Sequence, residues 1–156
     1  MLQPNKKSKS AKTGATFAIV ASRYNARYVD AMLRAAKAEL KRAGAKVLIV
    51  RVPGAYEIPV VVAAVARTSS PRVAGIICLG VILRGATTHA QHIGEAVSDA
   101  LVLIQLEYEV PVIHEVLLLE NEDQARTRCL DPKHNRGLEA AQTALEMARV
   151  MKSLRD

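Results

Sequence analysis

From residue 16 onwards, short runs of apolar residues alternate with longer stretches in which apolar residues recur every three or four positions. The short runs are rich in Val, Ile and Leu, which favours strands. Four strands are therefore predicted, over residues 16–21, 46–52, 73–83 and 111–119. The third run is apolar throughout, as expected for a strand that is buried on both faces of a parallel sheet.

The stretches between these runs have helical spacing. Over residues 26–43, one helical face collects Val29, Met32, Leu33, Ala36 and Leu40, and Gly44 is placed to end the helix. A short helix is expected from Pro59, a long one after residue 88, a short one through about Arg128 and a last one near the C-terminus. Three side-chain caps are predicted for these helices: Thr88 with Gln91, Asn121 with Gln124, and Asn135.

Strand and helix thus alternate four times, and right-handed crossovers are expected between parallel strands. The predicted fold is α/β, a three-layer αβα sandwich around a four-stranded parallel sheet of flavodoxin-like type. Residues 15–156 are expected to form a single domain. Residues 1–14 are polar and rich in Ser and Lys, which predicts a disordered basic tail.

The amino-acid composition agrees with this predicted fold. Half of the residues are hydrophobic but only five are aromatic, so the core must be aliphatic. No apolar run approaches the roughly 18 residues of a membrane span, and two cysteines make no disulfide framework. We therefore expect a cytoplasmic protein that does not bind membranes. Of the net charge of +7, four units belong to lysines in the first thirteen residues. A basic arm for nucleic acid is the alternative to a solvated tail, but no nucleic-acid motif supports it elsewhere.

The carboxyl ends of the strands are where an open α/β sheet binds ligands. Two of the five aromatic residues, Tyr24 and Tyr56, fall at the ends of the first two strands. Tyr24 offers a flat ring for a heterocycle, and Glu57 offers an acceptor for sugar hydroxyls or ring N–H groups. The plainer alternatives are a tyrosine packed under a loop and a solvated carboxylate.

The segment after the third strand, residues 85–88 (GATT), leads into a helix start. Its free N–H groups, hydroxyls and helix dipole suit an anion such as phosphate. His89 lies in the first helical turn, where a neutral imidazole suits acid–base catalysis, and the plainer alternative is an ordinary surface histidine. A metal pair with His92 lacks a third ligand at convincing spacing, so no metal is expected. Arg128 is a candidate second contact to phosphate, or simply part of a solvated basic helix face.

Together these segments resemble the lumazine synthase family. Tyr24-Asn25 resembles the family's aromatic–Asn pair, residues 53–59 (PGAYEIP) its second loop, and residues 79–89 (LGVILRGATTH) its phosphate loop and catalytic histidine. The resemblance continues through residues 110–121 (VPVIHEVLLLEN), 124–128 and 135–141, and covers about residues 16–152.

The resemblance implies that the chain condenses 5-amino-6-(D-ribitylamino)uracil with 3,4-dihydroxy-2-butanone 4-phosphate. This is the penultimate step of riboflavin biosynthesis, and it needs no cofactor. By the same resemblance, Tyr24 stacks on the pyrimidine and His89 transfers protons. The pyrimidine and its ribityl chain would be held by Ala55, Tyr56, Glu57, Val81, Ile82 and Leu83. The phosphate would be bound by Ala86, Thr87 and Arg128.

The resemblance also implies a homo-oligomer, either a pentamer or an icosahedral shell of sixty subunits, with riboflavin synthase as a further partner. Apolar residues beyond one stripe of the long helix fit such packing. The family's site lies between subunits, so Arg128 and the end of the fourth strand would come from the partner chain. Residues 130–132 (LDP) replace the family's glycine-containing version, so both assembly sizes stay open.

One position departs from the family pattern: His114 stands where the family commonly has Phe. It is counted among the substrate-binding residues, with a different affinity or pH dependence expected. Two other functions stay open. A non-catalytic flavin- or lumazine-binding module would bind the product without condensing the substrates. A structural shell or nucleic-acid-associated protein would depend on the basic tail.

Overall fold

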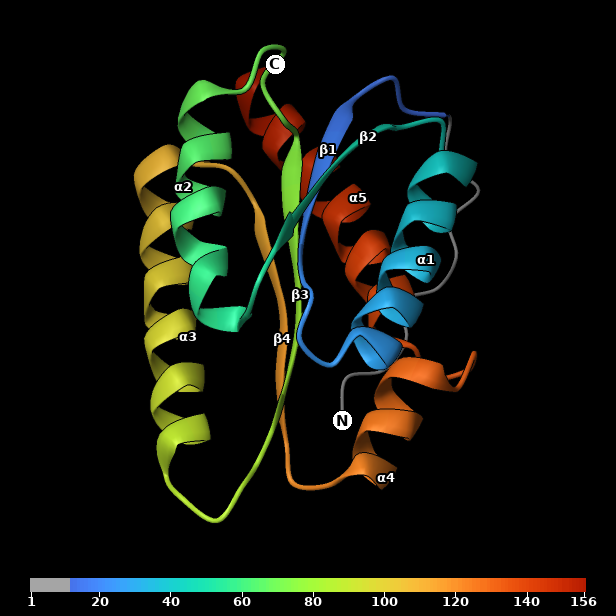
Figure 1. The fold of residues 1–156 in the computed structure, drawn as a ribbon. Helices are drawn as coiled ribbons and strands as arrows, with labels where there is room; N and C mark the ends of the chain where they lie inside the picture. Colours follow the sequence, from blue (N-terminus) through green and yellow to red (C-terminus); the bar gives the residue numbers. More distant parts are fainter. Residues whose placement is uncertain (1–11) are drawn as a thin grey trace.

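Four parallel strands form the middle layer of the molecule, in the order β2-β1-β3-β4 (Figure 1). The computed structural model describes residues 12–156. The strands are β1 (Thr16–Ser22), β2 (Lys46–Val52), β3 (Gly75–Leu83) and β4 (Val112–Leu119). The helical elements are α1 (Ala26–Arg42), η1 (Ala55–Glu57), α2 (Ile58–Thr68), α3 (His89–Tyr108), α4 (Glu122–Ala125), η2 (Arg126–Leu130) and α5 (Arg136–Arg155). The predicted αβα sandwich with a flavodoxin-like sheet is confirmed.

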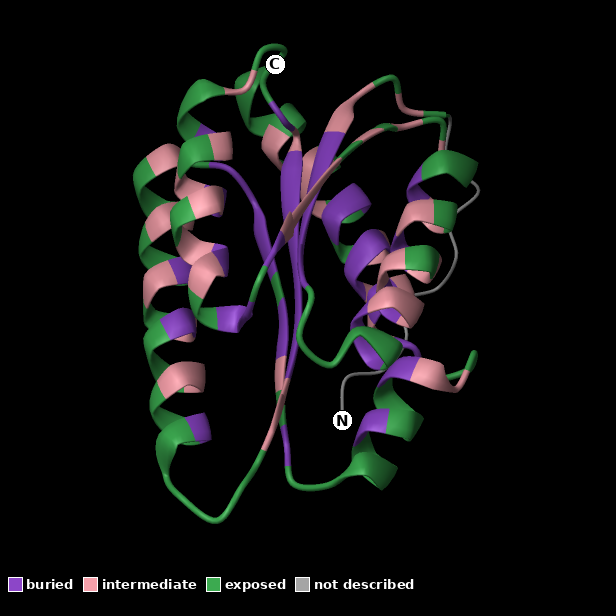
Figure 2. Cartoon of the chain, viewed as in Figure 1, coloured by how far each residue is buried: buried purple, intermediate pink, exposed green. Residues whose placement is uncertain are grey.

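Each face of the sheet is covered by two helices, α1 and α5 on one side and α2 and α3 on the other (Figure 1). The α1/α5 side is filled by residues such as Met32 and Leu40, and the α2/α3 side by residues such as Ile58 and Leu101. Figure 2 shows these buried positions lining the inner surfaces of both helical layers. Within residues 12–156 the buried aromatic side chains are Phe17 and Tyr28, so the core is aliphatic as predicted.

Two of the three predicted caps are confirmed. The Asn121 side chain accepts a hydrogen bond from the Gln124 N–H at 2.9 Å, and Asn135 accepts from the N–H groups of Gly137 and Leu138. The cap at Thr88 is wrong, because Thr88 lies at φ −79° and ψ 2° and its side chain makes no capping hydrogen bond. A capping side chain normally requires extended backbone at that residue.

Element ends differ from the prediction by a few residues. The third strand begins at Gly75 instead of residue 73, and the short helix predicted through Arg128 continues as the π-helix η2 to Leu130. Of the predicted tail, residues 1–11 lie outside the described residues, while Thr13 donates its N–H to the Ala43 carbonyl at 2.8 Å. None of the helices in the described part of the chain is long and apolar enough to cross a membrane.

Candidate active site

The loops that leave β1 and β2 are joined by their backbones. The N–H of Arg23 donates to the Val52 carbonyl at 2.8 Å, and the N–H of Tyr24 donates to the Pro53 carbonyl at 3.0 Å. The Tyr24 ring lies directly on Gly54, since a Cβ atom at Gly54 would be 2.8 Å from Tyr24 Cδ2. Tyr24 is nevertheless 67% exposed, so it is an open aromatic surface and not a core residue.

Glu57 meets Tyr24 at the same glycine. Its Oε2 accepts the Gly54 N–H at 2.9 Å, which fixes the carboxylate at the turn into η1. Ala55 is buried and Tyr56 is 65% exposed. Because η1 also contacts β3 and α3, this loop lies at the centre of the carboxyl edge of the sheet.

Asn25 connects this edge to β3, a role that the sequence did not reveal. It adopts the left-handed conformation at φ 57°, and its Nδ2 donates to the Val81 carbonyl at 2.7 Å. Asn tolerates this conformation better than most residues. An Asn directly after a strand was therefore the sequence feature that could have indicated a left-handed turn at this position. Val81 is buried, and Ile82 and Leu83 are half-buried at the end of β3.

The loop between β3 and α3 is attached to the end of β4. The Arg84 N–H donates to the Leu119 carbonyl at 2.9 Å, and the Arg84 guanidinium pairs with Glu120 at 2.8 Å. Ala86 and Thr87 in this loop are exposed. In the part of the chain that the structure describes, the N–H groups of Ala90 and Gln91 in the first turn of α3 have no acceptor. The loop and this helix start therefore suit an anion.

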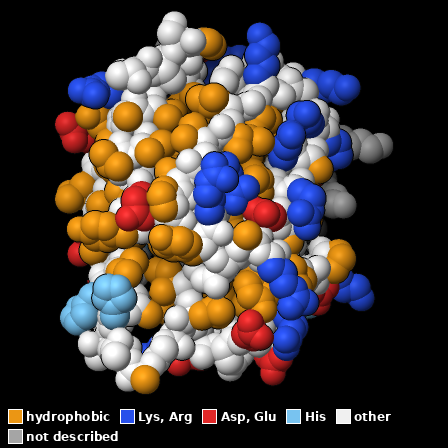
Figure 3. Space-filling view, viewed as in Figure 1, with side chains coloured by type: hydrophobic (Ala, Val, Ile, Leu, Met, Phe, Trp, Pro, Cys, Tyr) orange, Lys and Arg blue, Asp and Glu red, His pale blue; other side chains and the backbone are white. Residues whose placement is uncertain are grey.

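His89 is the first residue of α3, and its side chain is exposed. The Thr87 hydroxyl accepts its backbone N–H at 3.4 Å, which ties the histidine to the loop. In Figure 3, histidine side chains gather at the lower left, over the start of α3. No group of three or more potential metal ligands occurs among residues 12–156.

Arg128 lies on the other face of the sheet from His89. It belongs to η2, whose Cys129 is part of the α1/α5 core, whereas α3 belongs to the α2/α3 core. Arg128 is exposed and makes no ion pair among the described residues, whereas its neighbour Arg126 pairs with both Asp123 and Glu122. An unpaired guanidinium is better suited to bind an anion than a paired one.

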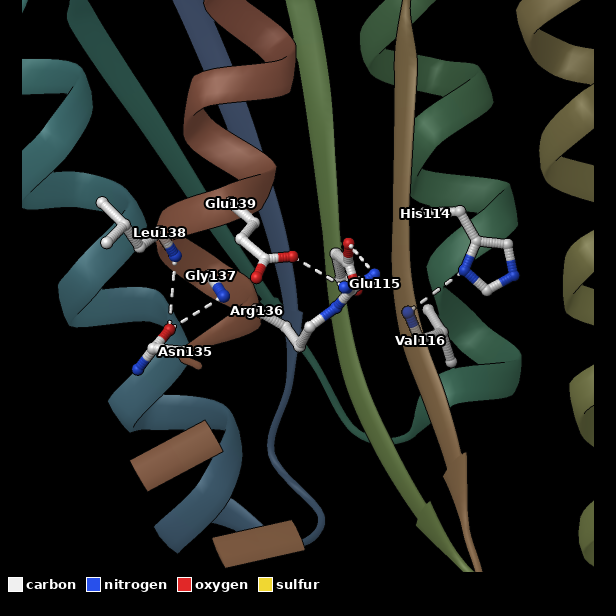
Figure 4. Close-up of polar contacts among 8 residues, drawn as sticks. All are labelled: His114, Glu115, Val116, Asn135, Arg136, Gly137, Leu138 and Glu139. Carbon is white, nitrogen blue, oxygen red and sulfur yellow. Dashed lines mark hydrogen bonds and ion pairs between the residues drawn. The ribbon is translucent and has the colours of Figure 1, made fainter. Parts of the chain in front are cut away.

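Behind Arg128, a buried carboxylate holds the start of α5. Glu115 on β4 is 6% exposed and makes two hydrogen bonds of 3.1 Å with Arg136, which also bonds Glu139 (Figure 4). Burial raises the pKa of Glu115, although the hydrogen bonds and charge of Arg136 act in the opposite direction. This network fixes β4 relative to α5 next to the Arg128 segment.

The structure therefore brings some predicted site residues together and keeps others apart. Tyr24, Glu57 and the end of β3 lie together at the carboxyl edge of the sheet, and the residue 84–88 loop extends beside them. Arg128 and the rest of the site lie on different faces of one chain. Cavities of about 290 and 560 Å³ occur elsewhere, and neither is lined by a predicted site residue. The candidate site of a single chain is thus an open surface.

Comparison with known proteins gives one consistent family. The family described as 6,7-dimethyl-8-ribityllumazine synthase matches residues 14–152. A 6,7-dimethyl-8-ribityllumazine synthase of Stenotrophomonas maltophilia (strain R551-3) is 38% identical over 143 residues, which are 90% of this chain and 91% of the relative. One of Xanthomonas campestris pv. campestris (strain B100) is 39% identical over 145 residues, 91% of this chain and 93% of the relative.

Proposed function

Because the chain belongs to the 6,7-dimethyl-8-ribityllumazine synthase family, we propose that it condenses 5-amino-6-(D-ribitylamino)uracil with 3,4-dihydroxy-2-butanone 4-phosphate. The chain is an enzyme of riboflavin biosynthesis and a transferase. The family match over residues 14–152 carries this conclusion, since it includes every loop of the candidate site. The proposed reaction uses neither a metal nor a redox cofactor.

The edge formed by the first three strands would bind the pyrimidine. Tyr24 would stack on its ring, because the phenol is exposed and its position is fixed against Gly54. The Glu57 carboxylate, held by the Gly54 N–H, would accept hydrogen bonds from the ligand. Further contacts to the pyrimidine and the ribityl chain would come from Ala55, Tyr56, Val81, Ile82 and Leu83.

The residue 84–88 loop would bind the phosphate with Ala86, Thr87 and a guanidinium from Arg128, and His89 would move protons beside it. The 5-amino group of the pyrimidine attacks the ketone and water leaves, which gives a Schiff base. Phosphate then leaves by elimination, and the ribityl-bearing amine attacks the resulting carbonyl, closing the ring with loss of a second water. Since both substrates are already reactive, orienting them together would supply up to about 7–11 kcal/mol of the acceleration.

We propose that each site is shared by two subunits, with Arg128 and the end of β4 supplied by the partner. Two features support this. Arg128 and His89 lie on opposite faces of one chain, and a broad apolar surface covers α2 and α3 (Figure 3). Its exposed large residues on these helices are Val60, Val102, Leu103 and Leu106. A ring of head-to-tail contacts would bury this surface and complete the sites.

The proposed assembly is a pentamer, with an icosahedral shell of sixty subunits as its larger form. Sedimentation velocity distinguishes the two directly. Riboflavin synthase and a cytoplasmic location are proposed on the same family grounds. A monomer that is stable at micromolar concentration and still active would contradict the shared site.

Gly54→Ala is expected to raise the KM for the pyrimidine substrate by about 10-fold, the effect of losing roughly 1.4 kcal/mol of binding. Gly54 has extended backbone, so alanine causes no conformational strain, but its Cβ would meet the Tyr24 ring and Glu57 Oε2. Steady-state kinetics with Gly14→Ala as the control would check this, because a Cβ at Gly14 meets no atom within 4 Å. An unchanged KM in Gly54→Ala would remove Tyr24 from the pyrimidine site.

Arg128→Ala is expected to raise the KM for the butanone phosphate by about 10–100-fold, because a hydrogen bond to a charged group contributes roughly 1.5–3 kcal/mol. The KM for the pyrimidine should change little. Arg126→Ala is the matched control, since it lies in the same π-helix but is already paired with Asp123 and Glu122. Equal effects of the two substitutions on KM would show that Arg128 contributes only general positive charge.

The direct test mixes both substrates with the purified protein and follows the absorbance and fluorescence of the lumazine. Condensation well above the spontaneous rate is expected. Binding of the product without condensation would support the alternative of a non-catalytic lumazine-binding module instead.

A further inference from the structure

His114 projects from β4 on the opposite side to Glu115 (Figure 4). Both of its ring nitrogens have partners. Nδ1 lies 3.2 Å from the backbone nitrogen of Val116, and Nε2 lies 2.7 Å from the Ser98 hydroxyl on α3. The residue is nevertheless exposed. The imidazole is therefore fixed along its polar edge and remains accessible to a ligand.

The hydrogen-bond donors around the ring determine where its proton lies. The Ser98 hydroxyl donates its hydrogen to the Gly94 carbonyl at 2.8 Å, so it is an acceptor towards Nε2. The Val116 N–H can only donate, so Nδ1 must be unprotonated. These contacts assign the neutral tautomer with its hydrogen on Nε2, as part of a chain of hydrogen bonds that ends within α3.

The surroundings of the ring favour this neutral form. Although His114 is exposed overall, partial burial of its ring against neighbouring residues lowers its pKa. The adjacent strand β3 carries no charged residue, and Glu115 points to the other face, where Arg136 binds it. On α3, Glu95 and Asp99 flank Ser98 but are exposed, and Glu95 accepts from Gln91. No ion pair joins His114 to a charged group within residues 12–156.

We propose that Ser98 is a positioning residue that acts through His114, holding the neutral imidazole so that its ring face contacts the pyrimidine and releasing it when the ring is protonated. This proposal rests on the proposed function and on the resemblance that counts His114, the third residue of β4, among the substrate-binding residues. It also means that replacing the family's Phe with His at position 114 makes pyrimidine binding dependent on pH. A phenyl ring has no polar edge, so it can be neither aligned by Ser98 nor protonated.

The sign of the pH effect follows from the geometry. Protonation places a hydrogen on Nδ1, which then faces the Val116 N–H, and two donors cannot share a hydrogen bond. The ring must rotate to relieve this conflict. Pyrimidine affinity should therefore be full at neutral pH and fall as the pH drops through the lowered pKa of His114. Binding of the butanone phosphate, whose own second phosphate pKa is about 6, should show the same pH dependence in the wild type and in His114→Phe.

The test measures pyrimidine Kd by titration calorimetry and pyrimidine KM from pH 5 to 8, on the assembled protein. The variants are Ser98→Ala, His114→Phe and the double variant. Ser98→Ala should weaken binding at neutral pH by about 2–10-fold, the loss expected for one hydrogen bond. His114→Phe should abolish the weakening at acid pH. In the His114→Phe background, Ser98→Ala should have no further effect, which is the coupling expected of residues in one network.

Two results would overturn the proposal. One is an equal effect of Ser98→Ala on pyrimidine affinity in both backgrounds, which would make Ser98 merely structural. The other is a pyrimidine affinity that still falls at acid pH in His114→Phe, or that does not fall at acid pH in the wild type. Calorimetry tests the roles of Ser98 and His114 separately from the proposed condensation, because it measures pyrimidine binding without turnover. A wild type that binds the pyrimidine pH-dependently but forms no lumazine would refute only the condensation. A wild type that does not bind the pyrimidine would refute both.

Discussion

His89→Ala is expected to lower kcat by about 10²–10⁴-fold, the usual contribution of a positioned acid–base group, without abolishing turnover. His89 is the first residue of α3, joined to the residue 84–88 loop through Thr87, and is exposed where the phosphate-bearing substrate would lie. The activity that remains should come from holding the two substrates together, which the variant leaves intact. Both KM values should therefore stay near those of the wild type.

The matched control for this experiment is His92→Ala. His92 is also exposed and lies one turn further along α3, with its N–H bonded to the Thr88 carbonyl. It should retain wild-type kcat. A His89→Ala protein that binds both substrates but has no turnover above the spontaneous rate would contradict this division between proton transfer and orientation. A wild-type kcat in His89→Ala would remove the histidine from the mechanism.

Gly137→Ala is expected to cause the largest loss of stability, about 3 kcal/mol or more, at the upper end of what overpacking a core costs. Gly137 is buried at the start of α5, and a Cβ there would overlap the Met32 carbonyl oxygen and lie 2.6 Å from the Met32 Cα. Backbone atoms cannot move aside as a flexible side chain can, so the two helices would have to separate.

Scanning calorimetry at a fixed protein concentration would measure this as a fall in Tm of roughly 6–12 °C for a chain of this size. Gly94→Ala is the control, because the nearest atom to its added Cβ is 3.7 Å away and the position is inside α3. Alanine there should keep or raise Tm, since it favours helix more than glycine does. An unchanged Tm in Gly137→Ala would contradict the close packing of α5 on α1.

The sequence pattern was sufficient for the fold because each element carries its own local signal. The apolar runs of β1 to β4, the single buried face of α1 and the glycine at residue 44, at φ 82°, are properties of neighbouring residues. The error at Thr88 has the same origin. A Thr three residues before a Gln matches a capping pattern, but the backbone that this loop adopts depends on its attachment to β4 through Arg84.

The candidate site was only partly predictable. Loop residues such as Tyr24 and Glu57 could be placed at strand ends, because the ends of parallel strands meet at one edge. Their meeting point at Gly54, the bond from Asn25 to Val81 and the link from Ser98 to His114 join residues distant in sequence. No periodicity encodes such contacts. Likewise, only the folded structure shows that Arg128 and His89 lie on opposite faces of the sheet.

The shared site can be tested most directly by mixing two impaired subunits. His89→Ala and Arg128→Ala chains would be co-expressed or refolded together, and condensation measured at low butanone phosphate. In a ring with sites between neighbours, about a quarter of the sites in an equal mixture combine an intact His89 with an intact Arg128. The activity of the mixture is therefore expected to return to about a quarter of the wild-type activity. A mixture no more active than the average of the two variants alone would contradict the shared site.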